Sequence, residues 1–145
     1  MTPKEYLQQL RKLDIMIDQR NRQLADMRSA LLSAADPGRE YTFGGMLPGD
    51  SRVVAWISKL QEREEELDSL IDHFWDLKCQ IIDELQGLDN PVSMQILYKR
   101  YVEYKRLEII AVEINYSYDW VKHAHGRALQ EFARRHPKTL STMLK

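Results

Sequence analysis

Residues 106–135, RLEIIAVEINYSYDWVKHAHGRALQEFARR, decide the fold that this sequence predicts. Apolar residues at helical spacing indicate a short helix over 106–114 and a longer helix over 118–135. Between the two, Asn115 stands where the chain needs a left-handed residue, a conformation that Asn tolerates. Ser117 follows as a residue that can cap the second helix. The pattern therefore predicts a helix-turn-helix.

A further helix is expected just before this pair. Asn90 can cap it, Pro91 fits its first turn, and its apolar residues continue to about residue 102. The three helices together predict a domain over residues 90–136. The remaining residues, 137–145, are expected to form a frayed tail.

The N-terminal part of the sequence predicts a long antiparallel helical hairpin. It opens with the capping box TPKE, and apolar residues then alternate at spacings of four and three through residues 3–35. The same heptad spacing marks a second helix over 51–88. We therefore expect a coiled-coil domain over 1–89, with a long flexible loop over 36–50 between its helices. The predicted fold class is all-α.

The second long helix carries more apolar residues than one partner helix covers. Trp56, Leu70 and Leu77 belong to a second stripe that lies beside the heptad seam. This surplus predicts a further contact, and a homodimer is the favoured interpretation. The competing account is that the loop and the C-terminal domain cover these residues within one chain.

The distribution of charge separates the two parts of the chain. The net charge is -1, but residues 1–89 hold 11 Lys and Arg against 17 Asp and Glu, whereas residues 90–145 hold 10 against 5. A basic end in a small protein favours a polyanionic partner, most often nucleic acid. Double-stranded DNA is the predicted partner, and the alternative is a solvated surface with uneven charge.

The last predicted helix presents polar or small residues away from its apolar face, and these suit base edges and phosphates. The expected DNA-binding residues are Tyr118, Asp119, Lys122, His123, Gly126 and Arg127. Support of the turn or contact with the DNA backbone is expected from Lys105, Arg106, Ser117 and Trp120. Gly126 would permit close approach of DNA or of a neighbouring helix, and Arg127 could instead pair with Glu131. The alternative is a three-helix packing unit whose outer face is only solvated.

The C-terminal sequence resembles region four of bacterial sigma factors, the module that reads an upstream promoter element. The matching elements are Leu97-Tyr98-Lys99-Arg100-Tyr101, Glu108-Ile109-Ile110-Ala111, Ser117, Val121 and Arg127-Ala128-Leu129. The whole chain is similar to small phage-encoded regulators of Gram-positive bacteria, which include late-gene activators and regulators of autolysin export. The elements that carry this second resemblance are Lys4-Glu5-Tyr6-Leu7 and His125-Gly126-Arg127-Ala128-Leu129.

The resemblance implies a DNA-binding transcription regulator. The surplus apolar surface of the hairpin predicts that residues 1–89 mediate self-association or docking to RNA polymerase. The sequence departs from the sigma pattern at three positions. Asn115 replaces a usual Gly, Trp120 stands at a position that is usually small, basic or polar, and Tyr104 stands where Gly is frequent in the turn. The N-terminal part also lacks the aromatic and basic cluster that melts promoter DNA. The resemblance therefore does not imply a complete sigma factor.

Enzymatic activity, metal binding and a cofactor are not expected. Cys79 is the single cysteine, His123 and His125 diverge on a helix, and the sequence offers no catalytic triad or phosphate-binding loop. It also contains no apolar run that could cross a membrane and no export signal, so we expect a cytoplasmic protein. The alternative function is a coiled-coil interaction protein whose helix-turn-helix packs against a partner and does not bind DNA.

Overall fold

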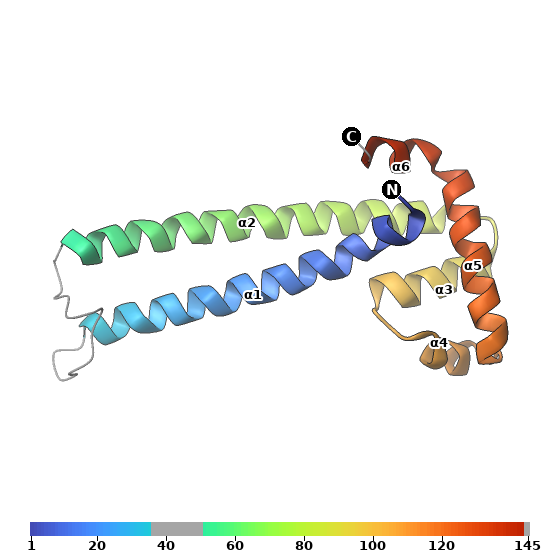
Figure 1. Cartoon of the computed structure of the whole chain (residues 1–145), viewed down its shortest axis with the longest axis horizontal. Helices are drawn as coiled ribbons and strands as arrows, with labels where there is room; N and C mark the ends of the chain where they lie inside the picture. The colour runs from blue at the N-terminus through green and yellow to red at the C-terminus, as the bar shows by residue number, and fades with distance from the viewer. Residues whose placement is uncertain (36–50, 144–145) are drawn as a thin grey trace. The chain divides into compact units, whose positions relative to one another are not determined.

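The computed structural model describes residues 1–35 and 51–143, and within these ranges it contains helices and no strand. Two long helices come first, α1 (Pro3–Ala35) and α2 (Ser51–Gln86) (Figure 1). The shorter elements that follow are α3 (Pro91–Leu97), η1 (Tyr98–Val102), α4 (Leu107–Ile114), α5 (Tyr118–Arg135) and α6 (Pro137–Met143). The predicted all-α class is confirmed. The loop expected over 36–50 lies outside the described residues.

The boundaries of α1 and α5 agree with the sequence prediction, whereas two other elements differ from it. The helix expected to run from 91 to 102 changes from α-helix to a π-helix at Tyr98, where the amide of Glu103 donates to the Tyr98 carbonyl at 3.1 Å. The frayed tail expected over 137–145 is instead helical over Pro137–Met143, where α6 follows α5 and buries Leu140; residues 144–145 lie outside the described residues. Pro137 ends α5 but also suits the first turn of a new helix.

By its contacts the chain divides into two compact units. The larger unit comprises Met1–Leu13 and Phe74–Lys145, and the smaller unit comprises Asp14–His73. This division differs from the expected boundary near residue 89. Each long helix therefore contributes to both units.

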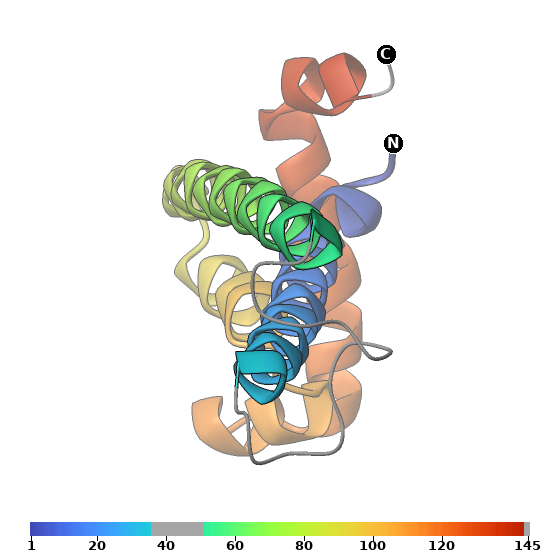
Figure 2. The same cartoon turned by 90° about the vertical axis from the view of Figure 1, so that its left-hand side faces the viewer.

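The smaller unit consists of parts of α1 and α2 that lie side by side and run in opposite directions (Figures 1 and 2). Its buried apolar cluster is Leu24, Met27, Leu60 and Leu67. The polar residue Glu64 interrupts the heptad seam, and its Oε1 accepts a hydrogen bond of 2.9 Å from Nη2 of Arg28 on the other helix. Ile57, whose place in the heptad spacing of 51–88 predicts a seam position, is instead exposed.

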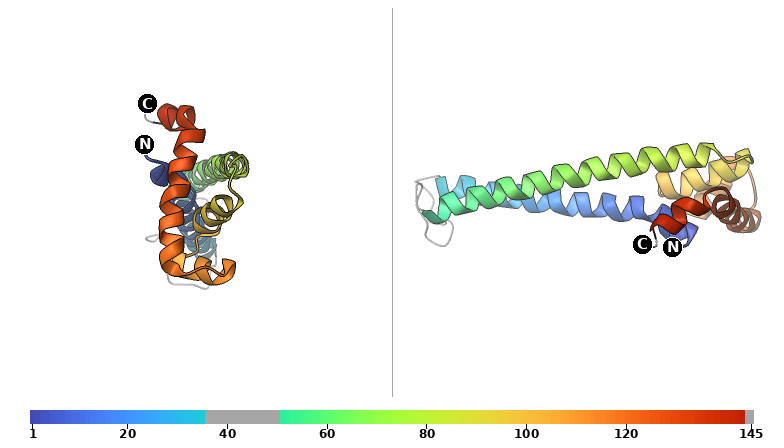
Figure 3. Two further views of the ribbon diagram at one scale, coloured as in Figure 1. Left: turned by 90° about the vertical axis from the view of Figure 1, so that its right-hand side faces the viewer. Right: turned by 90° about the horizontal axis from the view of Figure 1, so that it is seen from above.

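The larger unit joins the first turns of α1 and the end of α2 to the C-terminal helices, and the start of α1 lies beside the C-terminal half of α5 (Figure 3). Tyr6 is fully buried, stacks on Phe132 with 5.9 Å between ring centroids, and donates a hydrogen bond of 2.5 Å to Oε1 of Glu84. Leu77 is 4% exposed here, so its expected place on a free stripe is wrong. Leu70 and Trp56, in the smaller unit, are only partly buried.

Candidate nucleic-acid interface

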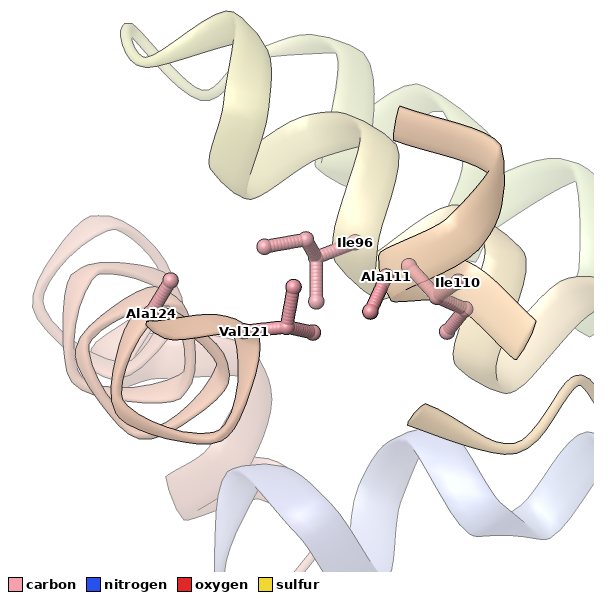
Figure 4. Close-up of a cluster of buried hydrophobic side chains, with 5 residues drawn as sticks. All are labelled: Ile96, Ile110, Ala111, Val121 and Ala124. Atoms are coloured by element: carbon pink, nitrogen blue, oxygen red, sulfur yellow. The ribbon is translucent and has the colours of Figure 1, made fainter. Parts of the chain in front are cut away.

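A compact apolar core fixes the position of α5 relative to α3 and α4. The buried cluster consists of Ile96, Ile110, Ala111, Val121 and Ala124 (Figure 4). Figure 4 shows Val121 of α5 facing Ile96 of α3, with the small side chain of Ala111 close by on α4. These contacts hold α4 and α5 together as a pair.

The turn between α4 and α5 has the predicted local geometry. Asn115 adopts the left-handed conformation, with φ 61 and ψ 43. The amide of Tyr116 then donates to the carbonyl of Ala111 at 3.0 Å, which closes the end of α4. Ser117 caps α5, because its Oγ accepts from the Trp120 amide at 3.1 Å. The predicted roles of Asn115 and Ser117 in the turn are confirmed.

The residues expected to read DNA lie on the exposed side of α5. Tyr118, Asp119, Lys122, His123, Gly126 and Arg127 are all exposed. The ammonium of Lys122 lies 5.1 Å from the Tyr118 ring centroid, so these two side chains form one cation–π pair at the start of the helix. Nδ1 of His123 lies 2.8 Å from the carbonyl oxygen of Asp119, which ties the imidazole to its own helix.

Gly126 and Arg127 remain accessible from solvent. A Cβ added to Gly126 would meet no atom within 4 Å, so no neighbouring helix in the described structure requires this glycine. Arg127 does not form the ion pair with Glu131 that the sequence suggested. Oε1 of Glu131 instead accepts from the Asn90 amide at 3.3 Å, at the start of α3. The guanidinium of Arg127 has no ion pair within the described part of the chain.

The expected supporting residues divide into two groups. Nζ of Lys105 lies 2.6 Å from Oε1 of Glu113 and 3.3 Å from Glu103, and these carboxylates raise the pKa of Lys105 while the pKa of Glu113 is lowered. Lys105 therefore supports the turn before α4 and offers no free charge. Trp120 likewise supports a turn, since its ring stacks on Tyr116 with centroids 4.0 Å apart. Arg106 is exposed and keeps its charge uncompensated within the described structure.

A Tyr–His pair beside this surface was missed by the sequence analysis. The Tyr101 hydroxyl and Nε2 of His125 are joined by a hydrogen bond of 2.8 Å, and the two rings stack. Burial, followed by the charges of Arg100 and Lys4, lowers the pKa of His125 to about 4, and burial raises the pKa of Tyr101 to about 12. Both rings are therefore uncharged at neutral pH. The signal was present, because His125 lies on the helical face of Val121 and Ala128.

This lowered pKa predicts an acid-sensitive stability. Between pH 6.5 and 4 the unfolded chain binds a proton at His125 that the folded chain does not, so stability falls as the pH falls through this range. After allowance for solvent screening, we expect a loss of about 1–2 kcal/mol in the free energy of unfolding. Denaturation of the wild type and His125→Gln at several pH values measures it. The difference in the free energy of unfolding between the wild type and His125→Gln should vary with pH. For His123→Gln, the control at an exposed site, the difference from the wild type should be the same at every pH.

Tyr104 adopts a backbone conformation that is costly for a side chain of its size. Its φ is 59, at the position where the sequence departs from the glycine that is frequent in sigma factors. A left-handed conformation costs a residue other than glycine about 1–2 kcal/mol. The ring of Tyr104 lies under the guanidinium of Arg11, 5.9 Å from the ring centroid, and this contact contributes to offsetting the strain.

The geometry thus brings together an exposed polar helix face, a capped turn and several uncompensated cations. None of the helices in the described ranges is long and apolar enough to cross a membrane. No family model, curated protein or solved structure matches this chain.

Proposed function

We propose that this chain is a sequence-specific DNA-binding transcription regulator of the phage-encoded type, with α4, the Asn115 turn and α5 acting as a helix-turn-helix. The observation that carries the proposal is the exposed face of α5, held in place by the turn and by the core under Val121. In a helix-turn-helix the second helix enters the major groove and the first crosses the DNA backbone. In this assignment α5 is the recognition helix.

The distribution of free charge supports this assignment. Lys99 and Lys105 are both engaged by Glu113, at 2.8 and 2.6 Å. Lys122 and Arg127 have no carboxylate partner in the described structure, and both lie on the proposed recognition helix. Cations that lack an internal partner are available for phosphates, whereas paired cations would first have to give up a salt bridge.

The long helices have a separate role in the proposal. We assign them to a coiled-coil hairpin that dimerises the protein or docks it to RNA polymerase, with the dimer favoured. One helix-turn-helix makes few base contacts, so strong specificity usually requires a second copy or a partner. Leu32 and Val54 are 73% and 57% exposed in the smaller unit, which leaves apolar surface there for such a contact.

Binding of the full-length chain to a pool of duplexes tests the proposal. We expect the protein to select duplexes that share a preferred sequence. Its affinity for such a duplex should fall steeply as the salt concentration rises. Lys122→Ala and Arg127→Ala should each reduce the slope of log affinity against log salt by about 1. Fluorescence anisotropy at four or more salt concentrations measures the slopes. Sedimentation of the complex gives the number of chains per duplex, for which we expect two.

Arg22→Ala is the matched control, because Arg22 is an exposed cation that pairs with Asp18 in the smaller unit. Its slope should equal that of the wild type. Full-length protein is needed, since a fragment of residues 90–145 would remove Tyr6 and Glu84 from the larger unit. A folded chain that binds no duplex at low salt contradicts the proposed function.

The alternative, an interaction protein, is favoured by one feature of α4. Ile109 and Val112 lie three positions apart on α4 and are 43% and 75% exposed. An exposed apolar stripe of this kind is typical of a protein contact. If the folded chain binds no duplex and Val112→Asp abolishes its binding to a protein partner, this second function is the correct one.

A further inference from the structure

A small pocket in the larger unit is lined by residues from α1, η1 and the turn before α4. The lining residues are Gln8, Arg11, Arg100, Tyr101 and Tyr104, and the volume is about 40 Å³. A water molecule needs about 10–15 Å³ by this measure, so the pocket has room for roughly three waters or one tetrahedral oxyanion. All five lining side chains can donate a hydrogen bond.

The charge of this pocket is positive and uncompensated. No carboxylate belongs to its lining, and neither Arg11 nor Arg100 forms an ion pair within the described ranges. Nη1 of Arg100 donates to the carbonyl of Lys105 at 3.1 Å, which fixes the guanidinium and leaves its other N–H groups available. The guanidinium of Arg11 stacks on Tyr104 and makes no other polar contact in the described structure.

Two features indicate that the pocket is a built site. Tyr104, which forms one wall and positions Arg11, is held at φ 59, and strained residues of this kind cluster at ligand sites. The Tyr101 hydroxyl, from another lining residue, shares a hydrogen bond of 2.8 Å with Nε2 of His125. One hydrogen bond therefore holds Arg100, and Arg11 lies over the Tyr104 ring. Arginine is well suited to bind phosphate oxygens.

We propose that this pocket binds a phosphate group through Arg11 and Arg100. Arg11 and Arg100 supply the charged N–H donors, and the absence of a carboxylate from the lining leaves their charge available for the phosphate. The phosphate can come from the DNA backbone or from a free phosphate compound. The DNA source rests on the proposed function. The phosphate site itself stands without it.

Titration of the full-length protein with inorganic phosphate tests the site. The arginine Nε–H signals are followed by NMR while sodium chloride keeps the ionic strength constant. We expect saturable shifts of the Arg11 and Arg100 signals only. Arg11→Gln should weaken phosphate binding by a factor on the order of ten, since one charge-assisted hydrogen-bonding partner is lost. Arg11 is exposed, so this variant should keep the fold, and Arg22→Gln is the control with unchanged binding.

A second pair of measurements identifies the source of the phosphate. If DNA supplies it, duplex competes with inorganic phosphate, and Arg11→Gln reduces the salt slope of duplex binding by about 1. If a free compound supplies it, phosphate shifts the same signals equally in the presence of duplex. Both results support the site. Failure of all duplex binding overturns the proposed function but leaves the phosphate titration interpretable.

The proposal is overturned by either of two results. One is a linear response of the Arg11 and Arg100 signals that chloride reproduces at equal ionic strength. The other is phosphate affinity that is unchanged in both Arg11→Gln and Arg100→Gln while the variants remain folded. Arg100→Lys separates charge from geometry, because it retains the positive charge and loses the planar fork. We expect its affinity to lie between those of the wild type and Arg100→Gln.

Discussion

Tyr6→Ala is expected to lower the free energy of unfolding by about 3–5 kcal/mol, although residue 6 is far in sequence from the C-terminal helices. Tyr6 is fully buried, its ring stacks on Phe132, and its hydroxyl donates to Glu84. The substitution leaves a cavity and also removes the donor that satisfies a carboxylate. Chemical denaturation measures the loss, and hydrogen exchange of the α5 amides locates it in the larger unit.

The hydroxyl and the ring of Tyr6 can be separated by a second variant. Tyr6→Phe keeps the stacking on Phe132 and removes only the hydrogen bond to Glu84. The other carboxylate oxygen of Glu84, Oε2, is buried without a hydrogen bond and lies 3.7 Å from Nδ1 of His136. The carboxylate thus has few hydrogen-bond partners. We therefore attribute about 1–3 kcal/mol of the loss in the free energy of unfolding to leaving this buried carboxylate without its donor, and Tyr6→Phe should show this part alone.

A double-mutant cycle with Phe132→Ala tests whether α1 stabilises α5 directly. Aromatic pairs contribute about 0.5–1.5 kcal/mol beyond the area that they bury, so the cycle should return a coupling energy of that size. Lys12→Ala, at an exposed position of α1, is the control and should change stability little. A Tyr6→Ala variant as stable as this control would contradict the contact.

The features that could be predicted from the sequence are those fixed by neighbouring residues. The capping box is an example, because the Thr2 amide donates to Glu5 at 3.0 Å and the Glu5 amide donates to Oγ1 of Thr2 at 3.2 Å. The left-handed Asn115 and the cap by Ser117 are similar. Each depends on atoms within a few positions along the chain, so residue type and spacing are sufficient.

The features that could not be predicted depend on contacts between distant segments. Tyr6 and Glu84 are 78 positions apart, and no periodicity in the sequence relates them. The same reason explains Leu77, which is 4% exposed although the sequence places it on the second apolar stripe. The exposed face of α5 was predictable from helical spacing, but the pocket at Arg11 and Arg100 was not. Its two arginines lie on α1 and η1, and only the fold brings them to one cavity.

Two adjacent isoleucines on α4 allow a final test of how the proposed helix-turn-helix is built. Ile110 is fully buried in the core with Ala111 and Val121, whereas the neighbouring Ile109 is 43% exposed. Ile110→Ala should lower the free energy of unfolding by about 2–5 kcal/mol, because it leaves a cavity between α4 and α5. Ile109→Ala removes the same atoms from the surface and should cost less than about 1 kcal/mol. Chemical denaturation of both variants measures the difference.

The same pair also distinguishes the two functions. If α4 acts by positioning α5, Ile110→Ala should weaken duplex binding and reduce sequence preference under conditions where most of the protein is still folded. Ile109→Ala should then bind DNA like the wild type. If α4 instead presents its exposed stripe to a protein partner, Ile109→Ala should weaken that contact while its stability is unchanged. Equal losses of stability in both variants would contradict the buried position of Ile110 in the core. The two substitutions remove the same atoms and differ only in the face of α4 from which these atoms are removed.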